Sequence, residues 1–368
     1  MSIPQIDIAP FLAGDPAGRR AVVDQWAHAF ETVGFATITG HGISERMLEQ
    51  VHDGAAQFFD LPLAAKLKCA QPGEARSHGY VGVAVEALAN TTGQSAVPAP
   101  PDLCETITFQ HCDWERRGIR SAFDETIYRP NLWPDEPPGF RPLVEVYFDR
   151  VYDLAQTLMR IGALALDLPE QHFAPYYDRM STQLRLTNYP HQTADPLPGQ
   201  LRSGAHTDYL GFTILRQDDA PGGLQVQAPD GGWIDVPPVA GSFVINAGDL
   251  LSRWTNGRWK SKFTAWSTRR ATSDTPRVEY RSCSSPAQIT TRSSNACRRA
   301  GRPKSHRTIL WCGPGITSWK RSVPAWRRAS AQTPLHGPSD SRLKNTAHAM
   351  VLISCRRTPQ KIRSSHLT

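Results

Sequence analysis

The stretch Gly204-Ala205-His206-Thr207-Asp208 combines two metal-binding side chains in a segment that its surroundings predict to be extended. Residues two positions apart in an extended chain project to the same face, so His206 and Asp208 can bind one metal ion together. Two histidines and one carboxylate on one face of iron(II) leave three adjacent coordination positions open. A His-x-Asp triplet alone occurs by chance in many chains, so the surrounding fold decides its meaning.

The residues after Gln183 form short strand-like runs separated by turn residues. One hairpin is predicted, because the turn at 229–232 joins the runs 223–227 and 233–236. This spacing is typical of a sandwich or jelly roll. The sequence therefore predicts a mainly β fold with flanking helices.

Helices and a strand are predicted ahead of the β region. Apolar residues recur at three- and four-residue spacing from Arg19, and the alternation at 34–39 predicts a strand. A turn and a second helix from Ser44 follow, and 144–168 carries a long amphipathic helix. His41 lies in the turn with no histidine or acid at metal spacing nearby, so we interpret it as a cap for local backbone rather than a ligand.

A set of motifs spread over about 260 residues accompanies His206 and Asp208 in a fixed order. They are Ile3-Pro4-Gln5-Ile6-Asp7, Gly34-Phe35, Gly40-His41-Gly42-Ile43, Asp102-Leu103-Cys104-Glu105, Asn131-Leu132-Trp133-Pro134, Gly223-Leu224-Gln225-Val226, Gly232-Trp233-Ile234-Asp235-Val236-Pro237-Pro238, Asn246-Ala247-Gly248-Asp249 and Trp254-Thr255-Asn256-Gly257-Arg258-Trp259-Lys260-Ser261.

With these motifs, residues 1–261 resemble the isopenicillin N synthase-like family of non-haem, iron(II)- and 2-oxoglutarate-dependent dioxygenases. The resemblance implies a double-stranded β-helix, or jelly roll, behind an N-terminal α/β region. It also implies iron held by His206, Asp208 and a histidine further on, and dioxygen-dependent oxidation of a small molecule as 2-oxoglutarate becomes succinate and carbon dioxide. Tyr189 matches the tyrosine that contacts 2-oxoglutarate, with a strand tyrosine packed on the sheet as the alternative. Asp249 is interpreted as a turn residue and not as a ligand.

The family pattern stops after Ser261, where a strand with the distal histidine and then an Arg-x-Ser strand should follow. Shifted by one base, the codons at 263–264 permit only His or Tyr, and 278–285 can encode an Arg-x-Ser strand. We therefore interpret residues 262–368 as out of frame, with the C-terminal strands, the third iron ligand and the arginine for 2-oxoglutarate lost. As written, the chain should be impaired as an oxygenase, and rescue of the iron by His306, His336 or His348 is disfavoured in such a tail.

Four segments are predicted on this basis. Residues 1–125 form the N-terminal region of the dioxygenase family, 126–177 a helical linker, 178–261 an incomplete jelly-roll domain and 262–368 a disordered basic tail.

The formal net charge of +7 hides two unlike parts. Residues 262–368 hold 21 Lys and Arg against three acids, a charge of +18, which leaves −11 for the rest. A basic tail suggests nucleic-acid binding, but its basic residues do not cluster on one helical face, so this function is disfavoured. Two alternatives stay open beside the oxygenase: an inactive pseudo-enzyme that holds metal weakly, and a nucleic-acid binder whose affinity would fall steeply with salt.

Compartment and assembly follow from what the sequence lacks. It shows neither a charged leader with an apolar run nor a membrane-length apolar stretch. The seven cysteines include no Cys-x-x-Cys pair, and Cys69, Cys104 and Cys112 are expected to be reduced thiols, without disulfides or zinc. A cytoplasmic monomer is the expectation. The sequence does not identify the substrate or choose hydroxylation over desaturation or cyclisation.

Overall fold

The structure is a computed structural model. It describes residues 2–70, 78–91, 98–111, 130–176, 181–190, 195–209, 211–218, 223–228, 230–267, 281–290 and 348–357.

The N-terminal region alternates short strands with helices. Its elements are β1 (Gln5–Asp7), α1 (Ala9–Ala13), α2 (Pro16–Thr32), β2 (Phe35–Thr39), α3 (Glu45–Phe59) and α4 (Leu63–Leu67). Helix α2 begins where the Asp15 carboxylate accepts a 2.6 Å hydrogen bond from Gly18 N, and Ser44 caps α3 by accepting from Met47 N at 3.3 Å. The predicted order of helix, strand, turn and helix is confirmed.

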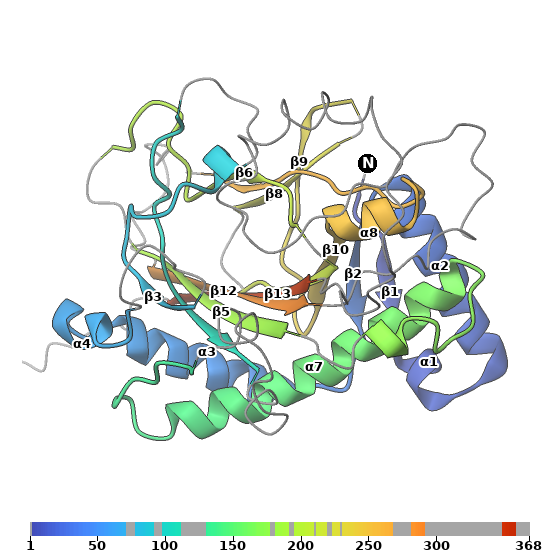
Figure 1. Ribbon diagram of the computed structural model, residues 1–368, viewed down its shortest axis with the longest axis horizontal. Helices are drawn as coiled ribbons and strands as arrows, with labels where there is room; N and C mark the ends of the chain where they lie inside the picture. The colour runs from blue at the N-terminus through green and yellow to red at the C-terminus, as the bar shows by residue number, and fades with distance from the viewer. Residues whose placement is uncertain are drawn as a thin grey trace, which may run out of the picture.

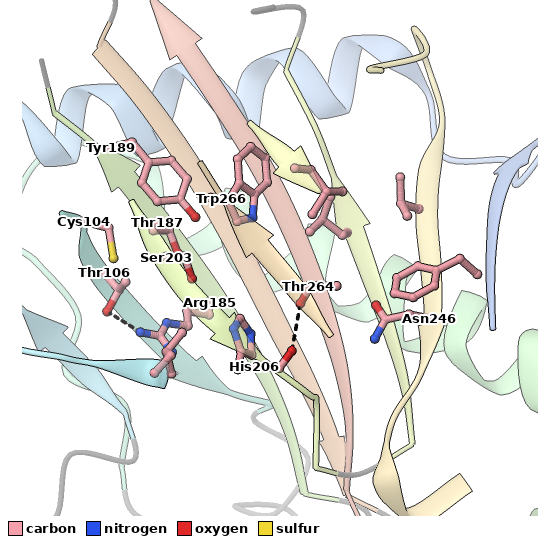
Figure 2. Close-up of a pocket in the computed structure, with 15 residues that line it drawn as sticks. Cys104, Thr106, Arg185, Thr187, Tyr189, Ser203, His206, Asn246, Thr264 and Trp266 are labelled. Carbon is pink, nitrogen blue, oxygen red and sulfur yellow. Dashed lines mark hydrogen bonds between the residues drawn. The ribbon is translucent and has the colours of Figure 1, made fainter. Parts of the chain in front are cut away.

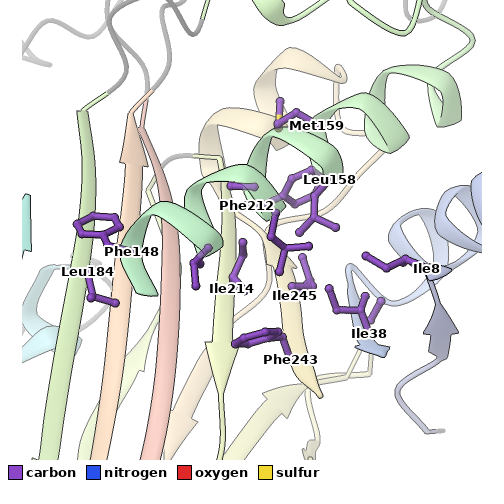
Figure 3. Close-up of a cluster of buried hydrophobic side chains, with 14 of the residues drawn as sticks. Ile8, Ile38, Phe148, Leu158, Met159, Leu184, Phe212, Ile214, Phe243 and Ile245 are labelled. Carbon is purple, nitrogen blue, oxygen red and sulfur yellow. The ribbon is translucent and has the colours of Figure 1, made fainter. Parts of the chain in front are cut away.

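Helix α7 (Phe140–Ala165) supplies the layer that covers the β region. It matches the helix predicted for 144–168 and begins a turn earlier. Figure 1 shows α3 and α7 along one side of the central strands, with β6, β8 and β9 on the other side. Figure 3 shows Leu158 of α7 beside Phe212 and Phe148 of α7 beside Leu184, and all four side chains belong to the main hydrophobic core.

The remaining described elements are mostly strands. They are β3 (Gly79–Val81), η1 (Leu88–Thr91), β4 (Glu105–Gln110), η2 (Ala174–Tyr176), β5 (Ser181–Tyr189), β6 (Ser203–His206), β7 (Phe212–Arg216), β8 (Leu224–Gln227), β9 (Trp233–Asp235), β10 (Phe243–Ala247), α8 (Asp249–Trp254), β11 (Thr264–Trp266), β12 (Arg281–Thr290) and β13 (His348–Arg357). The predicted hairpin is confirmed, because β8 and β9 pair antiparallel.

The strands form three groups, in the orders β1-β2-β10-β7, β6-β11-β8-β9 and β12-β13-β5-β4-β3. Strand β2 from the N-terminal region pairs antiparallel with β10 and so belongs to the same layer as the jelly-roll strands. The group β6-β11-β8-β9 faces this layer, and the space between the two holds the pocket described below. The mainly β, jelly-roll fold with flanking helices is confirmed.

The C-terminal part differs in one respect from the prediction. Residues 262 onward were expected to lack strands, but β11 pairs with β6 and β8, and β12 and β13 pair with β5. The edges of β5, β6 and β8 carry backbone N–H and C=O groups that need hydrogen-bond partners. The following segment can supply these partners as a strand even though its sequence lacks alternating apolar and polar residues. The division at 125, 177 and 261 stays a prediction.

None of the helices within the described ranges is long and apolar enough to cross a bilayer. Cys69 and Cys104 are buried free thiols, and Cys112 lies outside the described residues.

Candidate active site

His206 is the last residue of β6, and its imidazole is buried and oriented by its own strand. Its Nδ1 lies 2.7 Å from the carbonyl oxygen of Gly204. Because a carbonyl oxygen can only accept, Nδ1 carries a proton, so in the neutral ring the lone pair is on Nε2. This is the form of histidine that binds a metal through Nε2, with a backbone carbonyl fixing the ring.

Asp208 follows in the loop after β6 and is also buried. Its Oδ2 accepts hydrogen bonds from Thr213 Oγ1 at 2.5 Å and Asn246 Nδ2 at 2.6 Å, which leaves Oδ1 directed to His206. Oδ1 lies 3.7 Å from His206 Nε2. Ligand atoms about 2 Å from one ion are at most about 4 Å apart, so both atoms can bind the same ion.

The third iron ligand is not found among the described residues, which contain no group of three His, Cys, Asp or Glu able to hold a metal. The donor pair therefore fits two of the three protein positions of a facial iron site. His306 and His336 lie outside the described residues, and His348 begins β13 with its side chain outside the description.

The residue opposite His206 is Thr264. The two are direct cross-strand partners of β6 and β11, and Thr264 Oγ1 lies 3.5 Å from the His206 carbonyl oxygen. Directly paired residues project to the same face of a sheet. Both side chains line the same pocket, as Figure 2 shows.

Asp102 links β6 to the η1 turn above it. Its Oδ1 accepts from Gly204 N at 2.8 Å and its Oδ2 from Leu88 N at 2.9 Å. Burial raises the pKa of Asp102, while these hydrogen bonds and the nearby His206 act in the opposite direction. A Cβ at Gly204 would lie 2.8 Å from Ala89 Cβ, so only glycine lets η1 approach the strand this closely.

The pocket lies between the two strand layers. Its lining is mainly apolar, with a few polar groups that include His206, Asn246 and Arg185. This is the composition expected of a small-molecule site. The further lining residues are Phe35, Leu88, Cys104, Thr106, Thr187, Tyr189, Ser203, Leu215, Leu224, Val244, Thr264 and Trp266.

Tyr189 lies on β5 and is buried in this pocket. Its ring packs at 5.2 Å between centroids against Trp266 of β11. The packing agrees with a strand tyrosine, and the position in the pocket agrees with a cosubstrate contact, so its role stays a prediction. Thr187 lines the same pocket.

His41 is a backbone cap, as the sequence predicted. Its Nδ1 accepts from Ile43 N at 3.2 Å, and its Nε2 donates to the Gly241 carbonyl at 2.8 Å. Burial lowers the pKa of His41, which keeps the ring neutral. Asp249 is the first residue of α8 and accepts from Thr207 Oγ1 at 3.3 Å. The sequence predicted a turn residue ahead of a helix, and the structure places Asp249 one step later, within the first turn of that helix.

Several residues around the site were not assigned a role from sequence. Thr213, Asn246, Asp102 and Arg185 come from four different strands or loops and meet only in the fold. Asn246 stood inside a recognised motif, and its spacing from Asp208 carried no signal of their contact.

Known proteins match this chain in sequence and in structure. A family model described as the non-haem dioxygenase in morphine synthesis N-terminal region matches residues 3–136, and the 2OG-Fe(II) oxygenase superfamily model matches residues 181–278.

Among curated relatives, a 2-oxoglutarate-Fe(II) type oxidoreductase, hxnY, of Emericella nidulans is 33% identical over 269 residues, covering 70% of this chain and 73% of the relative. A homoarginine-6-hydroxylase of Glycine max is 34% identical, covering 71% of this chain and 79% of the relative. A Neurospora crassa protein crystallised with alpha-KG and thymine has a TM-score of 0.68 and 28% identity, covering 84% of this chain and 92% of that structure.

These matches establish what the motifs and the fold indicated. The chain belongs to the non-haem oxygenases that use iron(II) and 2-oxoglutarate to oxidise small molecules.

Proposed function

We propose that His206 and Asp208 hold iron(II) in this chain and that 2-oxoglutarate enters the pocket beside them, where Tyr189 contacts it. The observation that carries the proposal is the 3.7 Å approach of His206 Nε2 to Asp208 Oδ1, with the other polar atom of each side chain already hydrogen-bonded. When bound, iron(II) supplies the dioxygen-dependent oxidation of the family.

The surrounding residues orient the ligands and exclude water. Thr213 and Asn246 fix the Asp208 carboxylate by two hydrogen bonds to one oxygen. Leu215, Leu224 and Val244 are buried on the pocket wall, so the reacting groups lie in a largely apolar space. Such a space strengthens electrostatic contacts and limits side reactions with water.

We further propose that the reading frame changes after Ser261 and that the chain is impaired as written. In the frame shifted by one base, the last base of the Phe263 codon and the first two bases of the Thr264 codon form one codon, which can encode only His or Tyr. With the missing base restored, this residue occupies position 264. Thr264 is the cross-strand partner of His206, so a histidine there would lie next to His206 on the face that carries both ligands. The codon argument and the strand register are independent, and both point to the same position.

The prime substrate we propose is a small polar molecule that contains nitrogen. This rests on the relatives, one of which is named for hydroxylating homoarginine and one of which holds thymine. A monomer working in the cytoplasm remains part of the proposal. Large exposed apolar side chains of the described residues, such as Leu12, Leu63 and Trp233, are spread over separate elements, which supports a monomer.

The test compares two chains. One is the chain as written, and the other is encoded by a gene with one additional base after the Ser261 codon. Iron- and 2-oxoglutarate-dependent release of succinate is expected to be fast in the second chain and slower by at least about a hundredfold in the first, because second-shell changes alone cost 10–100-fold and here a ligand is missing. Equal rates in the two chains would contradict the proposed frame change, and reading the coding DNA across 256–270 would decide which chain occurs naturally.

A further inference from the structure

Thr207 lies between the two proposed iron ligands, and its side chain is bound from helix α8. His206 Nε2 and Asp208 Oδ1 lie 3.7 Å apart, so these two side chains share one side of the segment. The Thr207 hydroxyl donates instead to Oδ2 of Asp249 at 3.3 Å, and Asp249 is the first residue of α8. Helix α8 therefore holds this segment through its middle residue, which is not one of the proposed ligands.

The main chain at the start of α8 binds the same part of the molecule. The first N–H groups of a helix have no acceptor within the helix, so carbonyl oxygens of a neighbouring segment can accept from them. The hydrogen bonds are Gly248 N to Gly211 O at 2.7 Å, Asp249 N to Asp208 O at 2.7 Å and Leu250 N to Tyr209 O at 3.0 Å. The start of α8 therefore fixes the backbone of Asp208 as well as the Thr207 side chain.

Asp208 is thus held both at its side chain and at its backbone. Thr213 Oγ1 and Asn246 Nδ2 orient the side chain, because both donate to Oδ2. These two contacts do not fix the main chain that carries the carboxylate. A binding site needs its groups within about 0.5 Å of the productive geometry, so an oriented side chain on a loose backbone is not sufficient. The contacts from α8 supply that second restraint.

We propose that Asp249 and Thr207 position the iron ligands, with Asp249 acting through the Thr207 hydroxyl. This rests on the proposed function, because it takes His206 and Asp208 as the ligands. Neither Asp249 nor Thr207 binds the metal, so both are positioning residues. A negative charge in the first turn of α8 also stabilises the start of that helix. Removing the charge of Asp249 while keeping its oxygen separates the two roles.

The experiment is a double-mutant cycle on iron(II) affinity, measured by anaerobic titration of the full chain. Asp249→Ala removes the acceptor, and Thr207→Val removes the hydroxyl at nearly the same volume. Each is expected to weaken iron(II) binding about tenfold, as is usual when an orienting group is lost. The double variant should lose no more than either single variant, because both changes remove the same hydrogen bond. Additive losses would overturn the proposed action through Thr207.

Conservative variants and a control separate positioning from charge and from stability. Asp249→Asn and Thr207→Ser keep the hydrogen bond and should each retain iron(II) affinity within about threefold. A loss in Asp249→Asn as large as in Asp249→Ala would show that the charge matters rather than the contact, and would overturn the proposal. The matched control is Asp15→Ala, which removes the carboxylate that accepts from Gly18 N at the start of α2. It should lower stability in urea and leave iron(II) affinity unchanged, whereas a parallel loss of affinity would show that affinity follows stability alone.

Hydrogen exchange tests the same contact without metal. In Thr207→Val the protection of the Asp249 and Leu250 amides should fall at least about tenfold, because the segment that accepts from them is released. Protection of the Thr255 amide, which donates to Leu251 O at 2.9 Å within α8, should stay the same. Unchanged protection of Asp249 and Leu250 would overturn the proposal. Lowered protection in a chain that binds no iron(II) would refute the proposed function alone.

Discussion

Replacing Asp102 should loosen the strand that carries His206. Its two carboxylate oxygens hold Gly204 N and Leu88 N, and Gly204 O in turn holds His206 Nδ1. This series of hydrogen bonds, from η1 through Asp102 and Gly204 to His206, therefore helps to fix the orientation of the imidazole. Asp102→Ala removes the acceptor for both buried N–H groups, and Asp102→Asn removes one.

The size of the effect follows from these contacts. Each buried N–H left without a partner costs about 1–3 kcal/mol. Burial raises the pKa of Asp102, so removing the carboxylate also removes a desolvation cost. The net loss in the free energy of unfolding should be about 2–4 kcal/mol for Asp102→Ala, a fall in Tm of roughly 3–5 °C for a chain of this size. Iron(II) affinity should fall about 10–100-fold in the same variant, as is usual when an orienting group is lost.

Urea unfolding gives the stability change, and anaerobic iron(II) titration gives the affinity change. The ¹⁵N shifts of the His206 ring in the metal-free chain report its tautomer directly, and Asp102→Ala should mix the two tautomers. Asp230→Asn is the matched control, since Asp230 accepts from Gly232 N at 3.0 Å in an exposed turn far in sequence from the site. A variant Asp102→Ala with unchanged iron affinity and an unchanged His206 tautomer would refute the argument that Asp102 positions the ligand.

Three other perturbations have defined outcomes. Thr264→His should tighten iron(II) binding at least about tenfold, because it adds an imidazole opposite His206, and an affinity no better than that of Thr264→Gln would count against this position. Lys66→Met should reduce the free energy of unfolding in urea by about 3–5 kcal/mol, because Lys66 Nζ lies 2.7 Å from the buried Glu105 carboxylate. The double variant Lys66→Met with Glu105→Gln should recover part of this lost stability. A loss under about 1 kcal/mol in Lys66→Met would exclude a stabilising pair. Burial lowers the pKa of His41 below its usual value of 6.5, so the unfolded chain binds more protons at His41 than the folded chain does. The free energy of unfolding should therefore fall as pH drops below about 6.5. His41→Gln should flatten this dependence of urea unfolding on pH, and an unchanged slope would exclude His41 as its source.

Much of the fold could be predicted because its signals are local. The helix of α2 follows from Val22, Val23, Trp26, Ala29 and Phe30, all of which are buried on one face. The β8–β9 hairpin follows from a turn between two alternating runs. In each case a short stretch contains both the pattern and its cause, so no distant contact is needed to read it.

The environment of the site could not be predicted in the same way. Asp208 meets Asn246 because β6, β7 and β10 come together in space, and nothing in the spacing of 38 residues fixes that meeting. Arg185 reads in sequence as an ordinary strand residue, and its pocket position depends on which face of β5 turns toward β6. The strands β12 and β13 were missed for a related reason, because their pairing with β5 is not written in their own alternation.

The most direct test of the proposed iron site is an anaerobic titration of the chain as written with iron(II), followed in parallel for His206→Ala. The control is His28→Ala, which changes an exposed histidine on α2. One weak binding event per chain is expected, which is abolished in His206→Ala and retained in His28→Ala. Equal iron(II) binding in both variants would show that the metal is held elsewhere and would contradict the assignment of His206 and Asp208.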